Sequence, residues 1–196
     1  MNTDGIRELV RSECLKEANG FGPAFFNEHI LPVLRYSRLL AGRLGADTLV
    51  VELAAYLHDL SAIRDMSVLP SHHLESARIA RLLLDEQGWP ATIRDSVCRA
   101  IETHSAPVKP GEGSAEQVCL SNADVISHLA RPAYWCFYLY GVRKLSYEQG
   151  LDWWRRRASD AWSALAPEAQ ALAASDRLTV LHLLDEDSRG MRSTGS

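Results

Sequence analysis

The chain has 196 residues, of which 46% are hydrophobic and 23% are charged, and its formal net charge is −4 at pH 7. This length allows one sizeable core, and the composition is typical of a globular protein rather than a disordered one. The charge leaves no basic surplus for binding a nucleic-acid polymer. The four cysteines include no C-x-x-C pair, so we expect reduced, mostly buried thiols.

Charged residues occupy the N-terminus where a signal peptide would need apolar ones, and no apolar run is long enough to span a bilayer. We therefore expect a cytoplasmic protein with no membrane partner. Residues 1–186 are expected to form one helical domain, and the Ser-, Gly- and Arg-containing residues 187–196 a flexible tail.

Apolar residues recur at helical spacing along the chain, and no stretch alternates as a β-strand would. The sequence therefore predicts an all-α fold. The expected helices span residues 4–18, 28–44, 48–59, 72–87, 90–104 and 115–130, followed by one that begins at Ser146 and one from 167 to about 185.

Several of these helix ends carry recognisable capping residues. Asn27 is a plausible N-cap for the second helix, and Gly45 suits its C-terminal end. Asp47 or Thr48 can cap the third helix. Residues 146–149, Ser-Tyr-Glu-Gln, form a capping box.

Histidine and aspartate residues fall at the ends or on the flanks of these helices in a regular order. His58 and Asp59 stand side by side at the end of an apolar helix, where both can reach a metal ion lying across the helix end. A lone buried histidine is more often an ordinary core residue, but here the order is H…HD…H…H…D. Imidazole and carboxylate groups are ligands that suit Fe, Mn, Co, Ni or Zn. The series comprises His29, His58, Asp59, His72 or His73, His104 and Asp124.

The ordered set, in these helical contexts, resembles the HD superfamily of metal-dependent phosphohydrolases over residues 27–129. The resemblance implies an all-α helical bundle of the HD type, with residues 133–186 forming a C-terminal helical cover. It also implies one or two divalent transition-metal ions, with Asp59 able to bridge them. The implied ligands are His29, His58, Asp59, His73, His104 and Asp124.

The adjacent residues His72 and His73 cannot both be expected to face the metal. We favour His73 as the ligand, with His72 as a substrate contact or proton donor. Arg64, close to the HD pair, and Lys109 are candidate phosphate-binding residues. The candidate catalytic residues are Asp59, His73 and Arg64.

Many family members follow the HD pair with Gly-Lys, whereas Ser61 and Ala62 occupy those positions here. The lysine that would contact phosphate is therefore missing. Either Arg64 or His73 takes that role, or the substrate is not the usual one.

The second half of the chain adds features that border the expected site. Residues 105–114 contain Pro and Gly and are expected to form a loop at the substrate mouth. The aromatic residues within 134–140 are expected to cover the open side of the bundle. His128 is expected to be an ordinary helix histidine, and Trp153 a core or interface residue.

These features predict a hydrolase that uses metal-activated water to cleave a phosphate ester of a small metabolite or nucleotide. One alternative is a mixed-valent di-iron oxygenase of the same fold, which iron content and oxygen uptake would distinguish. A second is a non-catalytic ligand-binding protein, which is disfavoured because every ligand position is filled. We expect a small phosphorylated substrate as the partner and leave a homodimer open.

Overall fold

Helices dominate the computed structural model, which describes residues 3–184, and this described part contains no β-strand. The predicted all-α fold is therefore confirmed. The tail expected over residues 187–196 lies outside the described residues. Within residues 3–184, no helix combines the length and the apolar character needed to cross a membrane.

The elements follow one another with short connections. In chain order they are α1 (Asp4–Cys14), the π-helical turn η1 (Phe26–Ile30), α2 (Leu31–Leu44), α3 (Thr48–Leu57), α4 (Leu60–Arg64), the 3-10 turn η2 (Met66–Ser71), α5 (His72–Glu86), α6 (Ala91–Thr103), α7 (Ala115–Ala130), α8 (Pro132–Cys136), the π-helical turn η3 (Phe137–Val142), α9 (Tyr147–Arg155), the π-helical turn η4 (Arg156–Ala161), α10 (Trp162–Ala164) and α11 (Pro167–Leu183).

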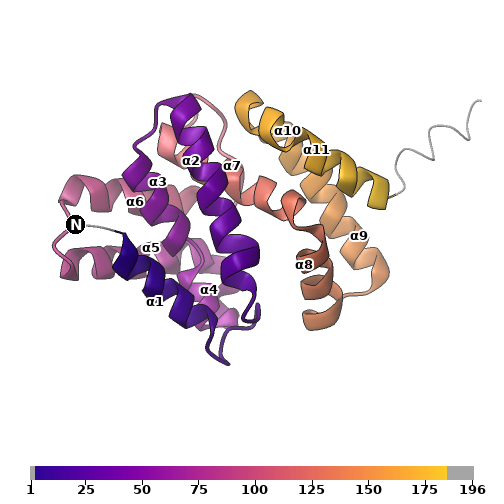
Figure 1. Cartoon of the computed structure of the whole chain (residues 1–196), viewed down its shortest axis with the longest axis horizontal. Helices are drawn as coiled ribbons and strands as arrows, with labels where there is room; N and C mark the ends of the chain where they lie inside the picture. Colours follow the sequence, from indigo (N-terminus) through magenta and orange to yellow (C-terminus); the bar gives the residue numbers. More distant parts are fainter. Residues whose placement is uncertain (1–2, 185–196) are drawn as a thin grey trace, which may run out of the picture.

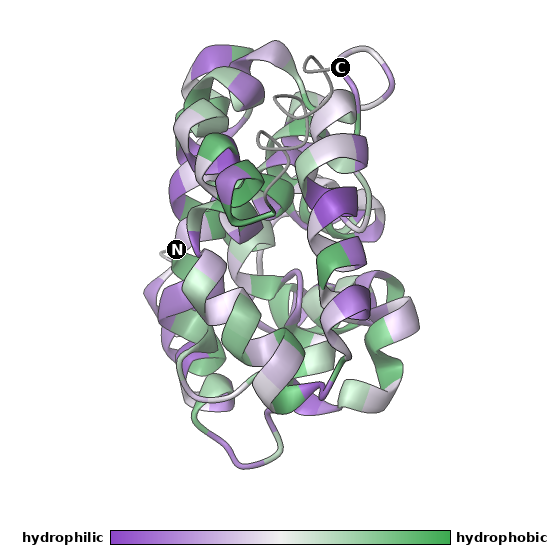
Figure 2. Ribbon diagram, turned by 90° about the vertical axis from the view of Figure 1, so that its right-hand side faces the viewer, coloured by the Kyte–Doolittle hydropathy of each residue, from purple (hydrophilic) through white to green (hydrophobic). Residues whose placement is uncertain are grey.

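Helix α7 lies between two groups of helices, α1 to α6 on one side and α8 to α11 on the other (Figure 1). It packs against α2, α3 and α6 in the first group and against α11 in the second. Hydrophobic and hydrophilic stretches alternate along the helices of both groups (Figure 2). Residues on α7 therefore face both the N-terminal bundle and its C-terminal cover.

Helix α3 is buried along most of its length, since every residue from Val50 to Leu57 except Glu52 is buried. A helix that is apolar on all sides is stable only inside a core. Asp47 starts it by accepting hydrogen bonds from the backbone N–H groups of Leu49 and Val50. The core thereby fixes the position of the HD pair, which follows directly after Leu57.

Most of the predicted helix ends agree with the structure. Gly45 ends α2 with a left-handed φ of 68°, and Ser146 forms the expected capping box with Gln149. The prediction for Asn27 is wrong, because helical hydrogen bonding has already begun when Glu28 donates to the carbonyl of Ala24 at 2.9 Å. The ring of Phe25, the residue just before η1, stacks on the ring of Phe21, and this contact favours the earlier start.

The first helix ends at Cys14 rather than near residue 18. The amide of Asn19 donates to the Cys14 carbonyl at 2.8 Å and to the Gly22 carbonyl at 2.9 Å. These bonds fold the chain back, so residues that suit a helix by composition form turns instead. Local competition from an Asn side chain is therefore the physical reason for the difference.

The four cysteines are free thiols, and three of them are buried. Burial, together with the nearby charges of Asp59 and Glu13, raises the pKa of Cys14 to about 12. Burial and the charge of Glu116 raise the pKa of Cys119 to about 12. These thiols are protonated and unreactive at neutral pH.

Candidate metal centre

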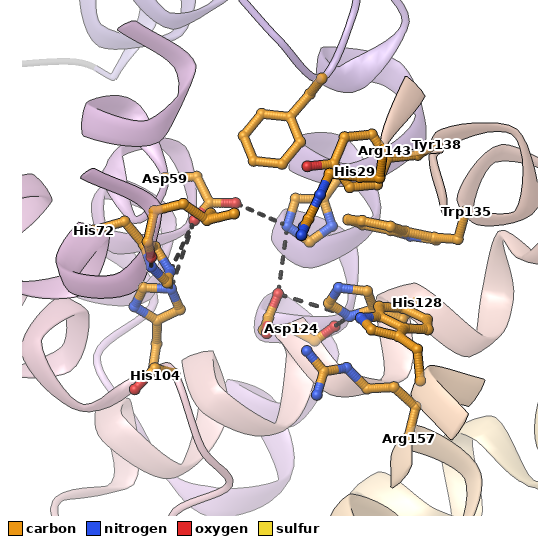
Figure 3. Close-up of a pocket in the computed structure, with 14 residues that line it drawn as sticks. His29, Asp59, His72, His104, Asp124, His128, Trp135, Tyr138, Arg143 and Arg157 are labelled. Carbon is orange, nitrogen blue, oxygen red and sulfur yellow. Dashed lines mark hydrogen bonds and ion pairs between the residues drawn. The ribbon is translucent and has the colours of Figure 1, made fainter. Parts of the chain in front are cut away.

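The carboxylate of Asp59 lies between two groups of histidines. Its backbone, with φ −107° and ψ 8°, occupies the break between α3 and α4. Its Oδ2 lies 3.3 Å from Nε2 of His29 and 3.3 Å from Nε2 of His58. Its Oδ1 lies 3.3 Å from Nε2 of His72 and 3.7 Å from Nε2 of His104. Asp59 therefore joins the two groups through different oxygen atoms (Figure 3).

A second carboxylate, that of Asp124 on α7, faces the first group. Its Oδ1 lies 3.3 Å from Nε2 of His29 and 4.0 Å from Nε2 of His58. One turn further along α7, His128 has its Nδ1 3.9 Å from the same oxygen. His128 was expected to be an ordinary helix histidine, but its ring is buried beside the cluster.

The potential ligand atoms form overlapping groups within residues 3–184. In each group the atoms all lie within 4.8 Å of one another. The groups are His29, His58 and Asp59; His29, Asp124 and His128; and Asp59, His72 and His104. The structure thus brings together five of the six predicted ligands and replaces the remaining one, His73, by His72.

Hydrogen bonds to backbone carbonyls turn the Nε2 atoms of His58, His72 and His104 to the centre. The distances are 2.8 Å from His58 Nδ1 to Ala55 O, 2.7 Å from His72 Nδ1 to Leu69 O and 2.7 Å from His104 Nδ1 to Ile101 O. His128 differs, because its Nδ1 bonds the Asp124 carbonyl at 2.7 Å and is also the nitrogen that lies near the Asp124 carboxylate. A carbonyl can only accept a hydrogen bond, so each Nδ1 carries hydrogen. In the neutral rings, the lone pair therefore lies on Nε2.

Nδ1 of His29 also carries hydrogen, but its partner is a hydroxyl group rather than a backbone carbonyl. The Ser127 hydroxyl donates to the Asp124 carbonyl at 2.7 Å, which leaves its oxygen to accept from Nδ1 of His29 at 3.1 Å. His29 therefore also presents an Nε2 lone pair. This arrangement, with Nδ1–H held by the protein, is the usual one for histidines that bind metal ions.

The Nε2 atoms then approach each other closely. The distance is 3.1 Å between His29 and His58, and 3.0 Å between His72 and His104. Facing lone pairs repel at this separation unless a proton or a cation lies between them. The mixture of imidazole nitrogens and carboxylate oxygens fits a divalent transition metal.

The charges of the cluster also favour a cation. Burial lowers the pKa of His58, but the charges of Asp59 and Asp124 and the hydrogen bond with Asp59 outweigh it and raise this pKa to about 9. Burial raises the pKa of Asp59, yet the surrounding histidines hold it well below its usual range. Without a metal, a proton on His58 therefore offsets part of the negative charge.

His72, rather than the expected His73, reaches the centre. Adjacent side chains on a helix diverge by about 100°, so only one of the pair can point to Asp59. The bond from His72 to the Leu69 carbonyl turns its ring inward. His73 Nδ1 is buried and has no hydrogen-bond partner among residues 3–184, and burial, with the nearby His72 and His104, lowers its pKa.

Two predicted phosphate-binding residues lie elsewhere. Arg64 donates from Nε and Nη2 to Oε1 of Glu13 on α1, at 3.1 and 2.9 Å. Lys109 is absent from the described residues that line the cavity over the metal centre. Proximity to the HD pair in sequence was misleading for Arg64, because α4 carries its side chain toward α1.

A cavity of about 220 Å³ opens over the centre, with its other walls coming from the C-terminal cover. The expected aromatic covering is present, since Trp135 and Tyr138 line this cavity (Figure 3). Arg143 and Arg157 also line it and were not predicted. No sequence signal separated Arg157 from Arg155 and Arg156, which precede it directly.

Known proteins share this sequence pattern and architecture. The family described as HD domain matches residues 26–129. A Ribonuclease Y from Thermoanaerobacter pseudethanolicus is 33% identical over 105 residues, which are 54% of this chain but only 18% of that protein. The crystal structure of a predicted HD superfamily hydrolase from an uncultured Thermotogales bacterium covers 82% of this chain and 84% of its own, with a TM-score of 0.56 and 22% identity. At that identity, the likeness concerns the fold.

Replacing Arg64 by Ala should lower the free energy of unfolding by about 1 kcal/mol without changing the metal content, because its partner Glu13 is buried and belongs to none of the ligand groups. Burial raises the Glu13 pKa, but its bonds with Lys16 and Arg64 bring it below the usual 4.5. A lowered carboxyl pKa stabilises the fold above that value and loses this effect at lower pH.

Urea unfolding at several pH values should therefore show the difference between Arg64→Ala and the parent shrinking below about pH 4.5. Arg11→Ala removes an exposed pair with Glu8 on the same helix and is the matched control, with an expected change under about 0.5 kcal/mol. A loss of metal in Arg64→Ala would contradict its placement away from the centre.

Metal affinity should fall as the pH falls, because the His58 pKa of about 9 means that binding displaces a proton from the cluster. One displaced proton corresponds to about a tenfold weaker affinity per pH unit. In the metal-free protein, the raised pKa contributes stability below about pH 6.5 that is lost as the pH rises through 9. Competition with a chelator at several pH values measures the first effect, and an affinity independent of pH would contradict it.

Proposed function

The chain belongs to the HD domain family, and on this basis we propose that it is a metal-dependent phosphohydrolase that cleaves a phosphate ester of a small metabolite or nucleotide. The observation that carries the proposal is Asp59, whose two oxygens face separate histidine groups. A carboxylate in this position can bridge two metal ions, an arrangement suited to phosphoryl transfer. The hydrolase name of the structural neighbour agrees with this proposal.

Two sets of ligands would hold the ions. The first set would be His29, His58, Asp59 and Asp124, and the second would be Asp59, His72 and His104. Metal coordination there would supply a water molecule of lowered pKa and polarise a phosphoryl oxygen. Hydrolysis would then move the phosphoryl group from the ester oxygen to water.

The protein's own residues supply orientation. Hydrogen bonds to carbonyls and to Ser127 hold the imidazole rings before a substrate arrives. Trp135 packs its ring 5.3 Å from the ring of His29 and 4.2 Å from that of His128, which keeps bulk water from this side of the cluster. A preorganised and partly dehydrated site strengthens electrostatic interactions with an anionic substrate.

The cavity supports a small substrate rather than a polymer. Its volume of about 220 Å³ lies below the roughly 300–1,000 Å³ of sites for drug-sized ligands. The net charge of −4 also provides no extended basic surface for a polynucleotide. The chain spans less than a fifth of the Ribonuclease Y that it matches, so that protein's name does not define the substrate here.

A screen of phosphate esters with added Mn²⁺, Co²⁺ or Fe²⁺ should detect phosphate release that a chelator abolishes. Asp59→Ala should lose essentially all of it, because the variant lacks the oxygens shared by both ligand sets. Equal release by Asp59→Ala and the parent would contradict the proposal. Substrate-dependent oxygen uptake by an iron-loaded protein, with no phosphate released, would replace it by oxygenase chemistry.

The adjacent histidines provide a matched test of the second ligand set. His72→Ala or His104→Ala should reduce the metal content from about two ions per chain to about one, because each removes an Nε2 that faces Asp59 Oδ1. His73→Ala should keep the parent's content. Elemental analysis of the folded variants measures these values, and full metal content in His72→Ala and His104→Ala would reduce the proposal to one ion.

A further inference from the structure

Arg157, on the π-helical turn η4, points its guanidinium into the cavity toward Asp124 (Figure 3). Its Nε atom is buried and has no hydrogen-bond partner within the described residues. The guanidinium lies 4.9 Å above the ring of Trp153. Arg143, the other arginine that lines the cavity, is exposed at its rim. Of the two arginines that line the cavity, Arg157 is therefore the less exposed to solvent.

The environment of Arg157 differs from that of other arginines in the described chain. Several of them pair with a carboxylate within 4.0 Å: Arg38 with Glu52, Arg64 with Glu13, Arg81 with Asp95, and Arg131 with Glu28. No such pair forms for Arg157 among residues 3–184. Arg157 is half-buried, and burial lowers its pKa against the opposing effect of Asp124, because a cation withdrawn from water without a paired carboxylate is destabilised.

Two further polar groups of the same cavity lack a hydrogen-bond acceptor within the described residues. Nε1 of Trp135 is buried without a hydrogen bond to any of residues 3–184, and the buried hydroxyl of Tyr138 has only the nearby guanidinium of Arg143, which opposes the rise in the Tyr138 pKa that burial causes. Both residues line the cavity with Arg157. An indole N–H and a guanidinium N–H can only donate, and a phenol hydroxyl can donate. A ligand rich in acceptor oxygens would satisfy all three groups.

The aromatic rings support Arg157 rather than forming a platform for a base. Trp153 stacks on Trp135 with ring centroids 5.5 Å apart and an interplanar angle of 24°. Trp135 in turn packs on His128 at 4.2 Å, while Arg157 covers Trp153. These faces are already occupied by neighbouring side chains, so their effect is to hold the guanidinium in place.

We propose that Arg157, with Tyr138 and Trp135, binds the phosphoryl oxygens of the substrate opposite the metal ligands. This assignment rests on the proposed phosphohydrolase function. A guanidinium offers a planar pair of N–H donors that matches two phosphoryl oxygens. The residues after the HD pair supply no alternative cation, since Ser61 and Ala62 are uncharged and Arg64 is paired with Glu13.

Calorimetric titration with inorganic phosphate tests the proposal on the metal-loaded full chain. Arg157→Gln should bind phosphate about tenfold or more weakly than the parent, since it loses charge-assisted hydrogen bonds. Tyr138→Phe should bind several-fold more weakly through the loss of one donor. Arg156→Gln removes the same charge from an exposed neighbour on η4 and should bind phosphate as the parent does.

Thermal unfolding separates this role from a structural one. Removing a half-buried cation that has no carboxylate pair among residues 3–184 should leave the melting temperature of phosphate-free Arg157→Gln unchanged or raised, with the metal content kept. If Arg157→Gln does not fold, Tyr138→Phe, which removes one oxygen atom, decides the matter by the same titration.

The outcomes distinguish the two proposals. If the parent releases phosphate from an ester while Arg157→Gln and Tyr138→Phe bind phosphate as tightly as it does, the assignment of this subsite is overturned and the phosphohydrolase function stands. If the metal-loaded parent neither binds phosphate nor releases it from any ester, both are overturned. Weaker phosphate binding in both variants, with the Arg156→Gln control unchanged, supports the assignment.

Discussion

Hydrogen bonds from imidazole Nδ1–H groups to backbone carbonyls determine the geometry on which the centre depends. His58, His72 and His104 each follow the last residue of a helix or 3-10 turn, and each bonds the carbonyl three residues earlier. The last carbonyls of a helix lack the usual N–H partner four residues on, so they can accept from a side chain. One bond thus satisfies a helix end and directs the Nε2 lone pair inward. The reverse tautomer would place an unprotonated nitrogen against a carbonyl oxygen, at a cost of about 1–3 kcal/mol.

Irregular helical turns bring the remaining groups to the same point. Asp59 lies in the break between α3 and α4, which frees its carboxylate to face both histidine groups. His29 lies on η1, Tyr138 on η3 and Arg157 on η4, and all three turns are π-helical. A π-turn adds a residue to one turn of helix and redirects the side chains that follow, and such turns occur often at functional sites. Each π-turn in the described chain therefore carries a residue that lines the cavity.

The sequence predicted the fold and most of the candidate metal centre because both depend on local patterns. Apolar spacing located α3, α5, α6 and α7. The order of His and Asp residues singled out His29, His58, His104 and Asp124, which the structure brings together around Asp59. The choice of His72 over His73 depends on a bond to the Leu69 carbonyl, which spacing does not reveal. Arg64, which was expected to bind phosphate, lies away from the cavity, and Arg157, for which no role was predicted, lines it. α4 turns Arg64 to Glu13, whereas the cover brings Arg157 to Asp124 across a long separation in sequence.

The metal-ligand residues form one part of the site and the residues of the cavity wall form another, and the HD family match, which ends at residue 129, includes only the first part. All the metal-ligand candidates that face Asp59 fall within residues 26–129, whereas Tyr138, Arg143 and Arg157 come after it. In the first part, backbone carbonyls hold the Nδ1–H sides of the imidazole rings, and the Nε2 lone pairs are left for a cation. The second part instead keeps donors unpaired, which lowers the stability of the isolated fold. Unpaired donors in a cavity wall become favourable only when acceptor oxygens fill the cavity. The stability given up in the C-terminal cover is therefore recovered on binding an oxyanion, and this separates substrate recognition from metal binding within one fold.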